Sequence, residues 1–179
     1  TTLLWSLNRN RIDQLLPEYT NEELGVTVHL DEMDVYSLGG AKQRLTVGGS
    51  MGDVYVNTMR TDEHGHIWMN SMTGTLETDK NNYVYAGNTN PKYTLSWRNE
   101  FNWKGISLGF MLNARVGGIG VSATQAVMDY YGVSKTSAEA RDNGGVKVNG
   151  QMIDAQTWYQ TIGANGTGYV GSMYVYSMT

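Results

Sequence analysis

The side chains with the clearest chemical potential are His64 and His66, which a single glycine separates. Residues two apart share one face of a strand, so these two imidazoles could hold a metal ion. A zinc site needs further ligands, however, and the chain has no cysteine and one other histidine, His29. We therefore expect a turn or an exposed surface at 64–66, and no metal or cofactor.

Two other patterns contain the residue types of ion or phosphate sites. Asp31, Glu32 and Asp34 supply carboxylate oxygens, but their spacing lacks the glycine and the final glutamate of a calcium loop. The run Gly48-Gly49-Ser50-Met51-Gly52 lacks the Lys-Ser/Thr pair and the following helix of a phosphate-binding loop. Calcium binding stays an alternative for the first pattern, whereas the second predicts a glycine-rich turn or a kinked strand.

Catalysis and nucleic-acid binding find no support in the residue types. Serine and aspartate are abundant, yet no spacing brings them together with a histidine. The lack of cysteine excludes a thiol nucleophile and a disulfide framework. The formal net charge of -4 disfavours nucleic acid, which binds basic surfaces. The sequence thus predicts a protein that is not an enzyme and has no nucleic-acid partner.

The strongest structural pattern is the alternation on both sides of Lys104-Gly105. Apolar and polar residues alternate over 93–103, with Asn99 as an exception, and again over 106–116, which is the period of strands. The Lys-Gly pair supplies a two-residue turn, so we expect a hairpin in which Trp103 faces Ile106. The apolar face of this hairpin holds Tyr93, Leu95, Trp97, Phe101, Trp103, Ile106, Leu108, Phe110, Leu112, Ala114 and Val116.

The dimensions of this hairpin match a membrane better than a soluble sheet. At roughly 3.3 Å per residue each strand measures about 36 Å, and a tilt of about 40° gives a height of about 27 Å. That height is close to the apolar band of an outer-membrane β-barrel, whereas soluble strands are shorter. The residues that would face lipid are Leu95, Trp97, Phe101, Leu108, Phe110 and Leu112.

Three charged residues, Arg98, Glu100 and Arg115, fall on the opposite face of the same hairpin. In a barrel, that face lines the lumen, so these residues are candidates for the translocation path. The alternative interpretation makes them solvated charges of the barrel wall that meet the plug.

The segment 118–170 shows helix caps in place of alternation. Ser122 and Gln125 form a capping box, and residues 136–139 repeat its pattern. Asp154 predicts the start of a third helix. We expect a folded loop of short helices. Weaker alternation elsewhere predicts strands over 2–9, 25–30, 44–47, 53–60, 83–86 and 173–177.

Trp158 and Tyr159 lie next to each other in the third of these expected helices. Aromatic rings of this kind can stack on a sugar, which makes both residues candidates for ligand contact. Such rings also commonly form the face by which a helix packs. The sequence leaves both interpretations open.

Several segments, collinear along the chain, resemble the SusC/RagA family of TonB-dependent transporters. Gly87-Asn88-Thr89-Asn90-Pro91-Lys92 is similar to the family's Gly-Asn-x-x-Pro-Lys. Asn99-Glu100-Phe101-Asn102-Trp103-Lys104 is similar to its Asn-x-Phe-x-Tyr-Lys, with tryptophan in place of tyrosine. Shorter matches occur at 8–12, 48–55, 64–65, 136–145 and 174–177.

The resemblance implies an outer-membrane importer of glycan or peptide nutrients, built as a barrel of about 22 strands around a plug. A SusD-like surface lipoprotein would cover its mouth, and TonB would supply energy through the plug. The resemblance also implies three other partners: the remainder of the same barrel, outer-membrane lipid, and an oligosaccharide or peptide substrate.

The expected fold class is all-β, as part of an antiparallel transmembrane β-barrel with a long external loop containing short helices. Residues 1–117 would form strands and turns, 118–170 the external loop, and 171–179 the start of the next strand. The chain would supply six to eight strands of one barrel domain, and the plug and the C-terminal strands would lie outside it. The alternative function is a secreted or surface β-sandwich that binds glycans, which predicts shorter strands and no lipid-facing aromatic stripe.

Overall fold

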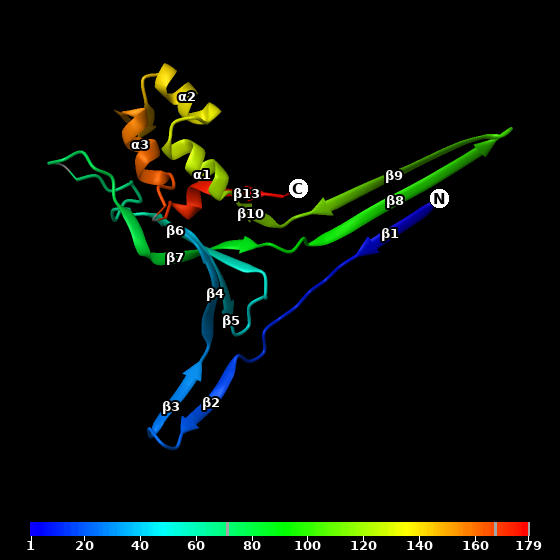
Figure 1. The fold of residues 1–179 in the computed structure, drawn as a ribbon, viewed down its shortest axis with the longest axis horizontal. Helices are drawn as coiled ribbons and strands as arrows, with labels where there is room; N and C mark the ends of the chain where they lie inside the picture. The colour runs from blue at the N-terminus through cyan, green and yellow to red at the C-terminus, as the bar shows by residue number, and fades with distance from the viewer. Residues whose placement is uncertain (71, 167, 179) are drawn as a thin grey trace.

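The molecule consists of a long arm joined to a head, with a second, shorter projection on the other side of the head (Figure 1). The computed structural model describes residues 1–70, 72–166 and 168–178. Strands hold 48% of the residues and helices 16%. The sheets are antiparallel, so the prediction of a mainly β chain is confirmed. Within the described residues, no sheet closes into a barrel.

The arm is a three-stranded sheet in the order β1-β8-β9. Its strands are β1 (Thr2–Ser6), β8 (Tyr93–Trp103) and β9 (Ile106–Val116). The predicted hairpin is confirmed: Trp103 lies opposite Ile106 and Tyr93 lies opposite Val116. Both residues of the turn have positive φ, 45° at Lys104 and 87° at Gly105. That geometry matches the right-handed twist of the two strands.

The head begins with a four-stranded sheet in the order β4-β5-β6-β7. Its strands are β4 (Glu32–Leu38), β5 (Ala41–Thr46), β6 (Asp53–Met59) and β7 (Thr78–Asn88). A small pair, β10 (Ile119–Val121) with β13 (Val175–Ser177), packs on one face of this sheet through Ile119, Val121 and Val175. Residues before the arm hairpin and residues after it therefore share one core.

Three short helices cover the rest of the head: α1 (Ala123–Tyr130), α2 (Lys135–Asp142) and α3 (Ala155–Ile162). The caps predicted at Ser122 and Asp154 are confirmed, because their side chains accept bonds from the Gln125 and Thr157 amides. The reverse bond of the predicted capping box was wrong, because the Ser122 amide donates to the Tyr174 carbonyl and the Gln125 side chain donates to Asp129. The predicted start of α2 at 136–139 was wrong by two residues, because Ser134 is the cap and accepts from the Ser137 amide. The remaining elements are β11 (Val146–Val148), β12 (Gln151–Ile153) and the 3-10 helix η1 (Gly171–Tyr174).

The main core lies where α1, α3 and η1 meet β6. It is built from large side chains of the helical segment, with Trp158, Tyr169 and Tyr174 all below 10% exposure. Ala126, fully buried, lets α1 approach α3 closely. The segment 118–170 is therefore a packed structure and not a loose connection.

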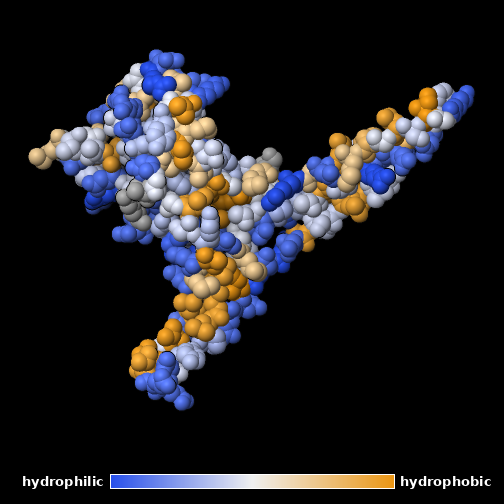
Figure 2. All heavy atoms as spheres, viewed as in Figure 1, coloured by the Kyte–Doolittle hydropathy of each residue, from blue (hydrophilic) through white to orange (hydrophobic). Residues whose placement is uncertain are grey.

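The shorter projection is the hairpin of β2 (Leu16–Asn21) and β3 (Val26–Leu30). Its register places Tyr19 opposite Val28 and Leu16 opposite Leu30, so these apolar residues share one face. Figure 2 shows apolar side chains gathered over this projection and the adjoining β4. Most of its residues are exposed.

The described strands fall into several separate sheets, so the expected six to eight strands of one barrel stay a prediction. Of the strands before Tyr93, only β1 joins the sheet of the arm, whereas β2 to β7 form separate sheets. The predicted strand at 2–9 ends at Ser6, and the one at 83–86 grows into the longer β7. Among the strands before Tyr93, β2 and β4 were not predicted, because Pro17 and the acidic residues at 31–34 conceal their alternation. The three-residue strands β10, β11 and β12 were not predicted either, since they are too short to show a period. In the described residues, no helix has the length and apolarity needed to cross a membrane.

Candidate functional site

The arm has two chemically different faces, and both are exposed to solvent over most of its length. On one face, Trp97 packs edge-on against Phe110 with ring centroids 5.2 Å apart, and Phe101 stacks on Phe110 at 6.3 Å. Yet Leu108 keeps 62% of its surface exposed and Trp103 keeps 67%. The β1 register adds Leu3 and Trp5 to this apolar face, because they lie opposite Trp97 and Leu95.

The opposite face of the arm carries the three charged candidates. Arg98, Glu100 and Arg115 lie opposite Met111, Gly109 and Thr94 respectively, which places all three on one side of the sheet. The structure brings two of them together, since Arg98 Nη2 lies 3.9 Å from Glu100 Oε2.

Arg115 stands apart from that pair at the head end of the arm, where its Nη2 donates to the Thr89 carbonyl at 2.9 Å. Four residue positions of strand, about 13 Å, separate its level from that of Arg98. The polar face therefore holds one exposed ion pair and one anchored guanidinium, and not a cluster of three charges.

Arm and head meet at a junction that links segments far apart in the sequence. The side chain of Asn10 accepts from Ser50 Oγ at 2.7 Å and from the Met51 amide at 2.8 Å. Backbone bonds between Ile12 and the glycines at 48 and 49 continue this contact, with Ile12 buried beneath them. The glycine-rich run at 48–52 is thus a turn that binds the segment following β1, through Asn10 and Ile12.

The third chain segment of this junction is 88–90, which connects the end of β7 to the start of β8. Asp53 Oδ1 accepts from Asn88 Nδ2 at 2.8 Å, and its other oxygen accepts from the Ser50 amide at 2.7 Å. The Thr89 amide donates to the Gly52 carbonyl. A Cβ at Gly52 would lie within 2.6 Å of side-chain atoms of Asn88 and Asn90, so a larger residue there would displace these amides. Three of the segments that carry the family resemblance therefore meet at one place.

A groove of about 650 Å³ opens at this junction, on the apolar side of the arm. Its aromatic walls are Trp5 and Tyr93, and its cations are Arg9 and Lys92. Sequence reasoning did not identify this groove as a site. The signal for it was the repeated asparagines, which flank both chain segments that enter the head. The remaining lining residues are Leu7, Asn8, Asn10, Ser50, Asn88, Asn90 and Pro91.

The two aromatic candidates in α3 have different surroundings. Trp158 is 8% exposed and belongs to the main core of the head, where it packs with other buried residues. Its burial is that of a helix packing face. Tyr159 is partly exposed, and burial raises the pKa of its hydroxyl above the ordinary value. Of the two rings, Tyr159 has more surface available for a ligand.

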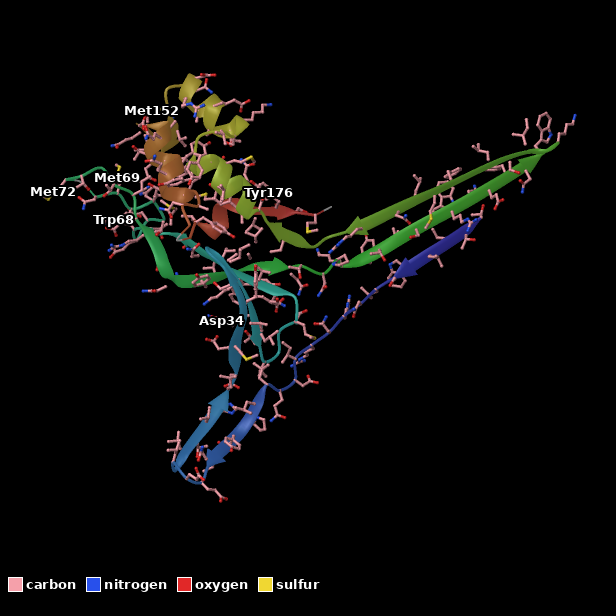
Figure 3. The ribbon with its side chains drawn as sticks, viewed as in Figure 1. Asp34, Trp68, Met69, Met72, Met152 and Tyr176 are labelled. Carbon is pink, nitrogen blue, oxygen red and sulfur yellow. The ribbon has the colours of Figure 1, made fainter. Side chains whose placement is uncertain are left out.

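Tyr159 borders a second groove, of about 630 Å³, between α1, α2 and the C-terminal segment. At its floor, the buried Asp129 accepts bonds from Gln125 Nε2 at 2.9 Å, from Thr136 Oγ1 at 3.1 Å and from the Ser134 hydroxyl. Burial, and then the charge of Asp129, raises the pKa of Tyr174. Figure 3 shows Tyr176 on β13 next to this region. No sequence pattern indicated the Asp129 network, because its members lie at irregular spacing between 125 and 136.

The acidic and histidine patterns are occupied by neighbouring side chains. Asp34, labelled on β4 in Figure 3, contacts Lys42 and Arg44 at 2.7 Å each. The hydrogen bond from Arg44 lowers the pKa of Asp34 below its ordinary value. Glu32 pairs with Arg44, and Asp31 with His29. These contacts leave the acidic pattern as a charged surface.

His66 lies against Asp62, whose carboxylate accepts amide bonds from His64 and His66 and closes a turn. The bond from the His66 amide lowers the pKa of Asp62. Within the part of the chain that the structure describes, no three histidine or acidic side chains converge in a way that could hold a metal ion.

Comparisons with known proteins do not extend these observations. No protein-family model and no curated protein matches the chain.

Proposed function

We propose that this chain forms part of the wall and the external surface of an outer-membrane, TonB-dependent importer of glycan or peptide nutrients. The observation that carries the proposal is the arm, a long sheet with one mainly apolar face, interrupted by Asn99, and one mainly polar face, both exposed. In water such a face would be strongly unfavourable, because exposed apolar surface costs roughly 25 cal/mol per Å². In a bilayer the same face is stabilised by lipid.

The distribution of aromatic residues along the arm supports this placement. Trp5 and Tyr93 lie at the head end of the apolar face, and Trp103 lies at the tip. Aromatic girdles mark the two interfaces of outer-membrane barrels, and about 25 Å of apolar band separates them. Ten strand steps of roughly 3.3 Å, tilted by about 40°, give about that separation.

The connections of the arm follow the asymmetry of such barrels. β8 and β9 are joined by two residues at the tip, whereas β1 and β8 are joined through the head. The chain leaves β9 at the same end and enters the head again. Short turns on the periplasmic side and long external connections would give this arrangement. In this proposal the tip is periplasmic and the head is external.

The arm also requires neighbouring strands. Among the described residues, no strand pairs with the outer edge of β1 or of β9. Unpaired backbone groups are not tolerated within a bilayer, so a barrel must continue on both sides. In our proposal the remainder of the same barrel supplies these strands, and the polar face with Arg98 and Glu100 lines the lumen.

The transport activity and the partners rest on the family resemblance. A SusD-like surface lipoprotein would lie over the head, TonB would act through a plug, and an oligosaccharide or peptide would be the substrate. The alternative, a glycan-binding β-sandwich, has less support. Its strands would be shorter, and a second sheet would cover the apolar face, but in the described residues no second sheet packs on the arm.

The test compares two adjacent residues of β9 that face opposite sides. Leu112 and Met111 are similarly exposed, at 58% and 54%. In the full-length protein, Leu112→Arg should weaken folding into lipid bilayers by about 2–4 kcal/mol, because its charge would enter hydrocarbon. Met111→Arg should cost about 1 kcal/mol or less, because that side chain would point into the aqueous lumen. Denaturant titrations in phospholipid vesicles measure both, and equal costs at the two positions would contradict a lipid-facing side.

A further inference from the structure

The junction groove combines cations and aromatic rings at one end of the apolar face. Trp5 and Tyr93 form its aromatic walls, and Arg9 and Lys92 supply two positive charges. No aspartate or glutamate is among the described residues that line it. The chain as a whole has a net charge of -4, so this pair of cations is a local reversal of sign.

Neither cation is neutralised within the part of the chain that the structure describes. Among the described residues, no carboxylate forms an ion pair with Arg9 or with Lys92. The stem of Lys92 lies beside Gly117, where a Cβ would approach its Cγ to 2.9 Å, and the Lys92 amide donates to the Val116 carbonyl. These contacts hold the residue at the head end of β9. Its ammonium group has no carboxylate partner among the described residues, so an anion from another molecule can neutralise it.

The level of the groove indicates where that anion would come from. If the arm crosses a bilayer, as in the proposed function on which this inference rests, Trp5 and Tyr93 lie at the boundary between hydrocarbon and headgroups. The groove then opens toward the headgroup layer on the side of the head. Lysine and arginine at that depth attract anionic headgroups, by about 1 kcal/mol for each charge.

We propose that this groove binds the phosphate of an anionic lipid headgroup in the leaflet on the head side. Arg9 and Lys92 would neutralise the phosphate oxygens, since arginine binds phosphate through two parallel N–H bonds and lysine as a point charge. The amides of Asn8 and Asn90, which also line the groove, provide donors for the hydroxyl groups of a headgroup. Trp5, Leu7 and Tyr93 give an apolar wall along which the acyl chains continue.

The test uses the full-length protein in an uncharged detergent, with dioctanoyl phosphatidic acid as the probe and native mass spectrometry as the measure of bound lipid. We expect one tightly bound lipid, and a loss of roughly 30-fold in affinity for the double variant Arg9→Gln, Lys92→Gln. The conservative pair Arg9→Lys, Lys92→Arg should keep most of the binding. The matched control, Lys135→Gln with Lys147→Gln, removes two charges from the head away from the groove and should leave affinity unchanged.

Two further measurements identify the source of the phosphate and separate this inference from the proposed function. Inorganic phosphate at the same concentration should not displace the lipid, and dioctanoyl phosphatidylcholine should bind at least tenfold more weakly. Displacement by phosphate, or equal binding of phosphatidylcholine, would overturn the lipid assignment. Flotation with phosphatidylcholine vesicles reports membrane insertion alone. If the wild type floats with these vesicles but shows no preference for phosphatidic acid in the mass spectra, only the groove proposal is wrong. If the wild type does not float, the proposed function is wrong as well.

Discussion

At the scale of single residues, the buried carboxylate of Asp129 links two helices of the head. Asp129 is 4% exposed and joins α1 to the start of α2, because Ser134, the cap of α2, donates to it. Ser134 is itself buried and also accepts the Ser137 amide bond that begins α2. The Asp129 carboxylate therefore positions the Ser134 side chain, which in turn caps the first turn of α2.

Replacing Asp129 by alanine should loosen this part of the head. The change removes the charged acceptor that Gln125, Ser134 and Thr136 share, and loss of such bonds costs about 1–3 kcal/mol. Hydrogen exchange at the amide of Ala138, which donates to the Ser134 carbonyl, should speed up by roughly 5- to 150-fold if local opening limits exchange. Asp142→Ala, at an exposed position of the same helix, serves as the control and should change little. Equal protection in wild type and Asp129→Ala would mean that the network does not hold α2.

At the scale of elements, the arm hairpin depends on its turn. Lys104 and Gly105 both have positive φ, which costs a residue with a Cβ about 1–2 kcal/mol. Lysine at the first position therefore accepts some strain, whereas glycine at the second does not. Gly105 is therefore the residue of the turn whose replacement should cost the hairpin most stability.

Gly105→Ala should destabilise the hairpin by about 1 kcal/mol, since alanine is disfavoured at positive φ. Lys104→Asn should have the opposite sign, because asparagine tolerates this conformation well. The control is Gly109→Ala within β9, where an added Cβ would come no closer than 3.9 Å to the Asn99 carbonyl. Denaturant midpoints of the full-length protein folded into vesicles compare the three variants. Loss of stability at Gly109→Ala equal to that at Gly105→Ala would show that the turn has no special role.

At the scale of the whole molecule, tip and head lie at opposite ends of the arm (Figure 1). In the proposed function, a bilayer separates them. The natural chain has no cysteine, so single cysteines can report the side on which each end lies. Lys135 in the head has a side chain that is 88% exposed, and Lys104 occupies the turn at the tip.

On intact cells, Lys135→Cys should react with a membrane-impermeant thiol reagent, and Lys104→Cys should react only after the outer membrane is permeabilised. The two variants control for each other's expression and reactivity. The reverse pattern would invert the topology, and reaction of both on intact cells would mean that the arm does not cross the membrane. These cells lack the SusD-like surface lipoprotein. When it is restored, labelling at Lys135→Cys should fall if the lipoprotein covers α2, and unchanged labelling would remove that contact from the proposal.

Local sequence patterns were sufficient to predict the arm hairpin and two of the helix caps. Alternation over 93–116 set the register, because a slip of one residue would exchange the apolar and polar faces. Ser122 and Asp154 set two helix starts, because capping is a local bond between a side chain and an amide two or three residues on. Each of these features depends on near neighbours in the chain.

Which elements pair or pack together became clear only from the three-dimensional structure. It assigned β1 to the arm and β2 to β7 to other sheets, a division that the alternation of each strand does not indicate. It placed Trp158 in a core and brought Asn10, Ser50 and Asn88 to one junction. Strand partners and buried contacts of this kind join residues many positions apart, and local periodicity contains no information about which distant segment completes them.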